Sequence, residues 1–252
     1  MEHNDGWRHR WGLLLGKIRR IQSAKDEQDL LHKLSTPDRP LMLAFANAHA
    51  MNSVAESHSF FKALHSADIV LRDGSGMATL FKLLNISPGI NLNGTDLIPQ
   101  LLRKFNHRGI ALFGTQSPYL EQGLQTVAKK FAPESRYTSA HGFLEVATYV
   151  ALAAASRPSV IVLGMGMPRQ EKVALALRDQ LNFPCLIICG GAIIDFLGGK
   201  TPRSPTWMRR IGVEWIFRLG LEPRRLFQRY VVGNPVFLAR ALLLAAAGWR
   251  NR

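Results

Sequence analysis

The chain has 252 residues, of which 47% are hydrophobic, and it carries a formal net charge of +14 at pH 7. This is enough apolar material to bury one sizeable core, so neither a disordered chain nor a small disulfide-stapled scaffold is expected. No run of 18 or more apolar residues occurs, and a membrane-spanning helix is therefore not expected.

The N-terminal stretch MEHNDGWRHRWGLLLGKIRR has only about four consecutive apolar residues between basic groups, too few for a secretory signal peptide. Residues 1–39 are interpreted as an N-terminal extension whose structure the pattern does not define. Cys185 and Cys189 lie in one apolar run, CLIIC, where strand geometry places them poorly for bridging. Free thiols in a reducing cytoplasm are therefore expected.

Strand-like and helix-like segments alternate along the central part of the chain. Apolar runs rich in Val, Ile and Leu occur at 41–46, 68–71, 110–113, 159–163 and 185–189. Helical patterns occur between and after them, at 51–66, 95–106, 118–131, 143–155 and 168–181. This alternation predicts an α/β fold with a largely parallel sheet covered by helices on both faces.

Small and polar residues follow each predicted strand, in the loops NAHAMN, RDGSG, GTQSP, GMGMPRQ and GGAIID. Ligands of such folds bind at the carboxyl ends of the strands, so these five loops are expected to converge on one crevice. Asp73 in the second loop has two interpretations: an N-terminal cap for a helix beginning near Ser75, or a functional carboxylate held at a strand end.

Cofactor and metal motifs are weak in this sequence. GMGMPR, at 164–169, begins like a dinucleotide fingerprint but lacks its third glycine, so no nicotinamide cofactor is expected. Its glycines could still bring backbone N–H groups close to a phosphate. No Asp-x-Asp pair occurs, so no metal site is expected, and cationic side chains or helix N-termini would neutralise a diphosphate instead.

The charge and the pattern of apolar residues change after residue 202. Residues 203–252 contain ten Arg and two acids, giving net +8, and residues 1–25 carry net +4, against +2 for the 177 residues between. An apolar stripe at helical spacing, with Pro223 and Pro235 each suited to a first helical turn, predicts two or three short amphipathic helices. Basic apolar helices predict an anionic partner: the cytoplasmic leaflet of a membrane or, as the alternative function, nucleic acid.

Seven segments, taken together, resemble the WecG/TagA/CpsF family of bacterial glycosyltransferases. They run in chain order from about residue 40 to 235: NAHAMN, ADIVLRDGSGM, NLNGTDL, LFGTQSP, GMGMPRQE, GGAIIDFLGGKTPRSPTWMRRIGVEW and RLGLEPRRLFQRY. The resemblance implies a Rossmann-like catalytic domain at 1–202 and a basic membrane-docking appendage at 203–252. It also implies a metal-independent, inverting transfer from a UDP-sugar to an undecaprenyl-diphosphate-linked sugar at the inner face of the cytoplasmic membrane.

The resemblance further implies roles for single residues. Asp73 matches an aspartate that is interpreted as the general base. Gln170 matches a glutamine that orients the sugar or the diphosphate, and Asp195 matches a second aspartate that accepts hydrogen bonds from donor-sugar hydroxyls. Arg203 is a candidate for stabilising leaving-group charge. The full set of implied substrate-binding positions is Asn47, Gly74, Gly76, Asn91, Gly114, Thr115, Gly164, Gly166, Gln170, Asp195 and Arg203.

Two departures leave the substrate open. Phe45 stands where many members have threonine, and Asn91 stands where an arginine is frequent. If that arginine stabilises the departing UDP, this chain needs a substitute, and Arg72 and Arg203 are the candidates. The donor could be N-acetylmannosamine, its uronic acid or glucose. The product could enter teichoic acid, enterobacterial common antigen or exopolysaccharide synthesis, and the oligomeric state, a homo-oligomer included, is not determined.

Overall fold

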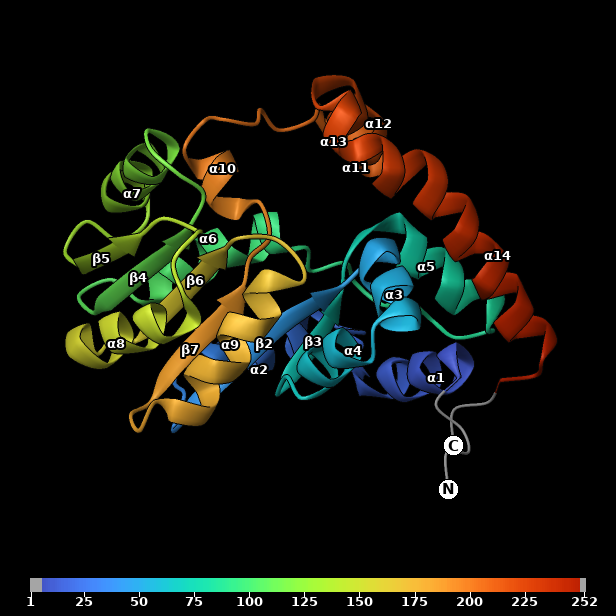
Figure 1. Cartoon of the computed structure of the whole chain (residues 1–252), viewed down its shortest axis with the longest axis horizontal. Coiled ribbons are helices and arrows are strands. Elements are labelled where there is room, and N and C mark those ends of the chain that lie inside the picture. The colour runs from blue at the N-terminus through green and yellow to red at the C-terminus, as the bar shows by residue number, and fades with distance from the viewer. Residues whose placement is uncertain (1–5, 250–252) are drawn as a thin grey trace.

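The computed structural model describes residues 6–249, which form an α/β body with a helical appendage (Figure 1). Its sheet has seven strands, all parallel, in the order β1-β3-β2-β7-β6-β4-β5. The strands are β1 (Ile18–Arg19), β2 (Pro40–Ala46), β3 (Ile69–Arg72), β4 (Gly109–Gly114), β5 (Arg136–Ala140), β6 (Val160–Gly164) and β7 (Cys185–Cys189). The expected α/β class and parallel sheet are thereby confirmed.

Helices cover both faces of the sheet, as expected. One face carries α1 (Trp7–Lys17), α3 (Ala48–Glu56), α4 (His58–His65), α8 (Val146–Ser156) and α9 (Arg169–Gln180). The other carries α2 (Ala24–Ser35), α6 (Gly94–Lys104), α7 (Tyr119–Lys130) and α10 (Ile193–Leu197). Strand β2 serves both cores, because alternate side chains point to opposite faces: Met42 and Ala44 pack on the first, Leu41 and Leu43 on the second.

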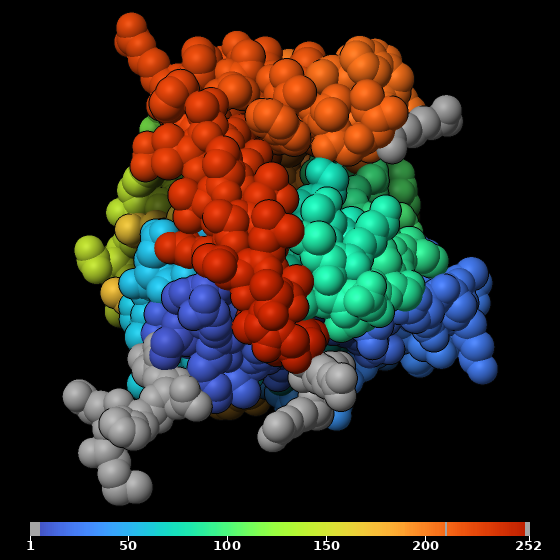
Figure 2. All heavy atoms as spheres, turned by 90° about the vertical axis from the view of Figure 1, so that its right-hand side faces the viewer, coloured from blue at the N-terminus to red at the C-terminus, as the bar shows by residue number. Residues whose placement is uncertain are grey.

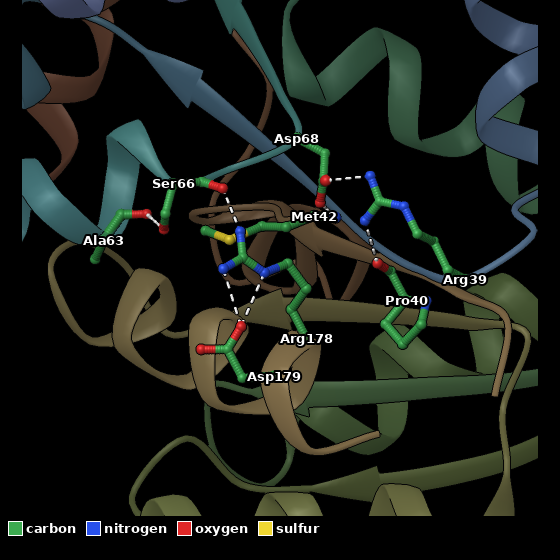
Figure 3. Close-up of polar contacts among 8 residues, drawn as sticks. All are labelled: Arg39, Pro40, Met42, Ala63, Ser66, Asp68, Arg178 and Asp179. Carbon is green, nitrogen blue, oxygen red and sulfur yellow. Dashed lines mark hydrogen bonds and ion pairs between the residues drawn. The ribbon is translucent and has the colours of Figure 1, made fainter. Parts of the chain in front are cut away.

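Polar contacts at the amino ends of the strands stabilise the edge opposite the predicted crevice (Figure 3). The Asp68 carboxylate, just before β3, accepts hydrogen bonds from the Met42 backbone at 2.8 Å and from Arg39 at 2.6 Å. On α9, Arg178 donates to the Ser66 carbonyl and to Asp179. These contacts fix the loops that begin β2 and β3, at the edge where such folds do not bind ligands.

Local sequence chemistry explains where the structure differs from the expected elements. The predicted helix at 51–66 is two helices, because the Ser57 side chain accepts a hydrogen bond from the Phe60 N–H and caps α4. Strand β5 is an edge strand with only one buried residue, so it lacks an apolar run. In the N-terminal extension, Trp11 and Leu14 are fully buried, which makes α1 part of the body.

The appendage begins with α11 (Thr206–Arg210) and α12 (Glu214–Leu221), followed by α13 (Pro223–Phe227), a π-helical turn at Gln228–Val232 and α14 (Gly233–Ala246). From Pro223 to Ala246 the helical path is continuous for 24 residues, and by length and composition alone it could cross a membrane. The expected short helices are present as α11 and α12, and Pro223 begins a helix as expected, but the helical path that follows is longer than the sequence pattern predicted. Pro235 does not break the path because it lies in the first turn of α14, directly after the π-helical turn.

Helix α14 packs along the body over α3, α5 (Gly74–Leu83) and α1 (Figure 2). Phe237 is buried against Trp11, with ring centroids 5.6 Å apart. A side-chain carbon at Gly76 would lie 3.2 Å from Ala48 Cβ and 3.4 Å from the Phe237 ring, so this glycine leaves room where α3, α5 and α14 meet. The Asn52 amide donates to the Gly233 carbonyl at 2.7 Å. These contacts attach the last helix of the appendage to the body, and the Ser75 hydroxyl attaches its beginning by donating to the Gly212 carbonyl at 2.9 Å.

Candidate functional site

A cavity of about 470 Å³, cavity 1, lies at the carboxyl ends of the five predicted strands. Residues from all five strand-end loops line it, which confirms that these loops converge. The predicted site residues among its lining are Asn47, Asp73, Thr115, Gly164, Gly166, Gln170 and Asp195.

Asp73 occupies the N-cap position of α5, but its side chain makes no capping hydrogen bond. It interacts instead with Asn47, at the end of the neighbouring strand. The Asn47 carbonyl oxygen accepts from the Ala50 N–H at 3.0 Å and caps α3, which leaves the amide group for Asp73. Burial raises the pKa of the Asp73 carboxyl, opposed by this hydrogen bond and by nearby arginines. The helix-cap interpretation therefore does not account for this carboxylate.

Gln170 is held in one orientation by two hydrogen bonds. Its Nε2 donates to the buried Glu171 carboxyl at 2.8 Å, and its Oε1 accepts from the Gly191 N–H at 2.8 Å. The amide thereby connects α9 to the loop after β7. Burial raises the pKa of Glu171 to about 7. Sequence reasoning identified Gln170 but not Glu171, whose place in the interior only the packing of α9 reveals.

Asp195, on α10, accepts a hydrogen bond from the Thr115 hydroxyl, and Lys200 Nζ lies 3.4 Å from its carboxylate. All three residues line cavity 1. Gly114, directly before Thr115, is not among the lining residues. A side-chain carbon there would lie 2.4 Å from Gly164, so Gly114 permits two strand ends to approach each other.

The main cations of cavity 1 were missed by sequence reasoning. Besides Lys200, they are Arg169 on α9 and Arg218, Arg225 and Arg229 of the appendage. Arg218 lies over the Phe196 ring at 5.4 Å, and Arg225 is bonded to Glu222 at 2.7 Å. The Nε groups of Arg218 and Arg229 are enclosed, without a hydrogen-bond partner among residues 6–249. The segment RLGLEPRRLFQRY, which contains Arg218, Arg225 and Arg229, could have indicated them, but its net positive charge led to the interpretation that these arginines face a membrane surface.

A second cavity of about 730 Å³, cavity 2, adjoins the first beneath the appendage. Six residues line both cavities, namely Asn47, Asp73, Thr95, Phe196, Arg218 and Arg229. Gly74, Gly76 and Asn91 line cavity 2 only. Asp73 therefore lies at the junction of two spaces large enough for separate ligands.

The two candidate replacement cations lie away from cavity 1. Arg72 donates to Asn91 Oδ1 at 3.1 Å and to the carbonyls of Pro88 and Gly89, and it lines cavity 2. Arg203 is paired with Asp96 and lines neither cavity. In this structure the cations of cavity 1 therefore come from α9, Lys200 and the appendage.

The sequence profile described as the Glycosyl transferase WecG/TagA/CpsF family matches residues 15–251. Curated relatives include N-acetylglucosaminyldiphosphoundecaprenol N-acetyl-beta-D-mannosaminyltransferases of Staphylococcus aureus. Those of strains NCTC 8325 / PS 47 and MRSA252 are each 24% identical over 190 residues, which covers 74% of this chain and 74% of the relative.

Proposed function

The chain belongs to the glycosyl transferase WecG/TagA/CpsF family, and from this premise we propose that it transfers a hexose or N-acetylhexosamine from a UDP-sugar to a sugar on undecaprenyl diphosphate. The names of the S. aureus relatives, which specify a diphosphoundecaprenol acceptor, support the lipid-linked substrate. The observation that carries the proposal is the position of Asp73, a carboxylate free of capping bonds at the junction of two cavities.

Asp73 is the proposed general base of an inverting displacement. Its carboxylate takes the proton of the acceptor hydroxyl as that oxygen forms a bond to the anomeric carbon. The bond from this carbon to the diphosphate oxygen breaks, and UDP leaves with the electron pair. The raised pKa of Asp73 suits a base, because a more basic carboxylate accepts a proton more readily.

Cavity 1 is the proposed site of the UDP-sugar. Lys200, Arg218 and Arg229 would offset the charge that grows on the departing diphosphate. The unpartnered Nε groups of Arg218 and Arg229 support this, since buried donors gain most from a ligand acceptor. Gln170 and Asp195 would bind the donor sugar, and the backbone of Gly164 and Gly166 would approach the phosphates.

The appendage is the proposed membrane contact, with the enzyme peripheral to the inner face of the cytoplasmic membrane. Eleven large hydrophobic side chains are exposed in the part of the appendage that the structure describes: Trp207, Ile211, Ile216, Leu221, Phe227, Val231, Val232, Val236, Leu238, Leu242 and Leu243. Interspersed arginines would add attraction to anionic headgroups. So many exposed apolar side chains would gain little from contact with a charged phosphate backbone, and this favours a lipid surface over nucleic acid as the partner.

The test is a transfer assay with a panel of UDP-sugars and N-acetylglucosaminyl diphosphoundecaprenol as acceptor. We expect one UDP-sugar to give a lipid-linked disaccharide with inverted anomeric configuration. Retained configuration, or transfer from no member of the panel, would contradict the proposal. The identity of the productive sugar would then assign the product to teichoic acid, common antigen or exopolysaccharide.

A further inference from the structure

Cavity 2 differs in chemistry from cavity 1. The appendage gives it an apolar and aromatic wall from Trp215, Tyr230, Phe237 and Leu238. The rings of Trp215 and Tyr230 pack at a centroid distance of 6.0 Å and an interplanar angle of 59°. Such a wall suits the carbon face of a sugar or a lipid chain better than a nucleotide diphosphate.

A second carboxylate belongs to this cavity. Glu214, the first residue of α12, lines cavity 2 together with Asp73, which reaches it from the end of β3. Burial and the nearby Asp73 charge raise the pKa of Glu214, while Arg218, Arg203 and Arg209 oppose the rise. Glu214 is a half-buried carboxylate with no ion pair to any residue that the structure describes, and it is well placed to accept hydrogen bonds from sugar hydroxyls.

The rim of cavity 2 offers a cation and an apolar exit. Arg209 on α11 lines the cavity, and its Nε is enclosed without a hydrogen-bond partner among the described residues. Leu238 lines the cavity as well and is 42% exposed. A chain that leaves past Leu238 would reach the outer surface of α14, which lies across the face seen in Figure 2.

We propose that cavity 2 binds the acceptor, and that Glu214 is the appendage's carboxylate for its sugar, opposite Asp73. The acceptor's diphosphate lies near Arg209, and its apolar chain leaves past Leu238. This assignment rests on the proposed function. In this assignment the body and the appendage together form the acceptor site: Asp73 belongs to the body, and Glu214 and Trp215 belong to α12 of the appendage.

The test compares Glu214→Ala and Glu214→Gln with the wild type and with Glu145→Ala, an exposed acid outside both cavities. The acceptor probe is N-acetylglucosaminyl diphosphate carrying a short alkyl chain, which makes the assay independent of membrane binding. For Glu214→Ala we expect the acceptor KM to rise about tenfold or more, as for loss of a charged hydrogen bond. Donor KM should stay within about twofold, and Glu214→Gln should recover part of the acceptor affinity.

Two outcomes would overturn this inference while the proposed function stands: an unchanged acceptor KM in Glu214→Ala, or a donor KM that rises as much as the acceptor KM. A lower melting temperature with both constants altered, and no recovery in Glu214→Gln, would indicate a structural role and also reject it. Failure of the wild type to transfer to any lipid diphosphate sugar would instead reject the proposed function itself.

Discussion

Asn47 and Asp73 directly follow two neighbouring parallel strands, and a hydrogen bond joins their side chains. Each is the N-cap residue of the following helix, but only Asn47 uses its side chain as a cap. The cap fixes the asparagine amide, and the amide in turn orients the carboxylate toward the two cavities. Asn47 is thus a positioning residue, and Asp73 is the residue proposed to react.

Asp73→Asn keeps the size of the side chain and removes the proton acceptor. We expect kcat to fall by roughly 10² to 10⁴ while UDP binding, measured by calorimetry, is largely kept. Stability should not fall, because the raised pKa means that the ionised carboxylate costs folding free energy as pH rises above its ordinary value of 3.8. Turnover close to that of the wild type would reject Asp73 as the base.

Arg229→Gln removes an enclosed cation that lines both cavities. We expect donor KM to rise by about tenfold or more, the effect of losing a charged hydrogen bond. Arg224→Gln is the matched control, since Arg224 is an exposed arginine of α13 outside both cavities. Equal effects of the two substitutions would indicate general charge attraction in place of a diphosphate contact.

Chelation tests how the diphosphate is neutralised. The lack of an Asp-x-Asp pair and the cations around cavity 1 lead us to expect an unchanged transfer rate in EDTA. The assay should follow initial rates after dialysis against the chelator. A transfer rate that is lost in EDTA and restored by Mg²⁺ or Mn²⁺ would mean that the cationic side chains of cavity 1 do not suffice to neutralise the diphosphate and that a metal ion is needed.

The sequence pattern predicted the five central strands and the loops after them, because each of these strands is a continuous apolar run that small or polar residues follow. It could not predict which side chains meet across the cavities. Arg229 and Asp73 are far apart in sequence. Tertiary contacts, among them the packing of Phe237 on Gly76 and Trp11, place the appendage over the strand ends. For the same reason the arginines of the appendage were assigned to a surface.

Glu171 provides a stability prediction with a defined pH window. Because burial raises its pKa from 4.5 to about 7, its stabilising protonated form is lost as pH rises through this range. Glu171→Gln should therefore gain up to about 3 kcal/mol in free energy of unfolding at pH 8, and little at pH 4.5. Urea unfolding at both pH values, with exposed Glu145→Gln as control, measures this. If Glu171→Gln raised the free energy of unfolding equally at both pH values, the raised pKa of Glu171 would be contradicted.

Membrane docking is best tested without deleting the appendage, because its loss would uncover Trp11 and the α3 surface. Leu242 and Leu243 on α14 are 56% and 52% exposed. Substituting both by Glu should lower co-sedimentation with phosphatidylglycerol vesicles by about tenfold or more, since it removes apolar burial and adds repulsion.

The melting temperature of this variant should stay unchanged, because both side chains point away from the body. Gln122→Glu with Gln125→Glu, two exposed positions on α7, adds the same charge elsewhere and serves as the control. With a short-chain soluble acceptor, transfer should proceed at the wild-type rate, whereas transfer to undecaprenyl acceptor in vesicles should fall with binding. Undiminished co-sedimentation of the Leu242→Glu, Leu243→Glu protein would reject α14 as the membrane contact.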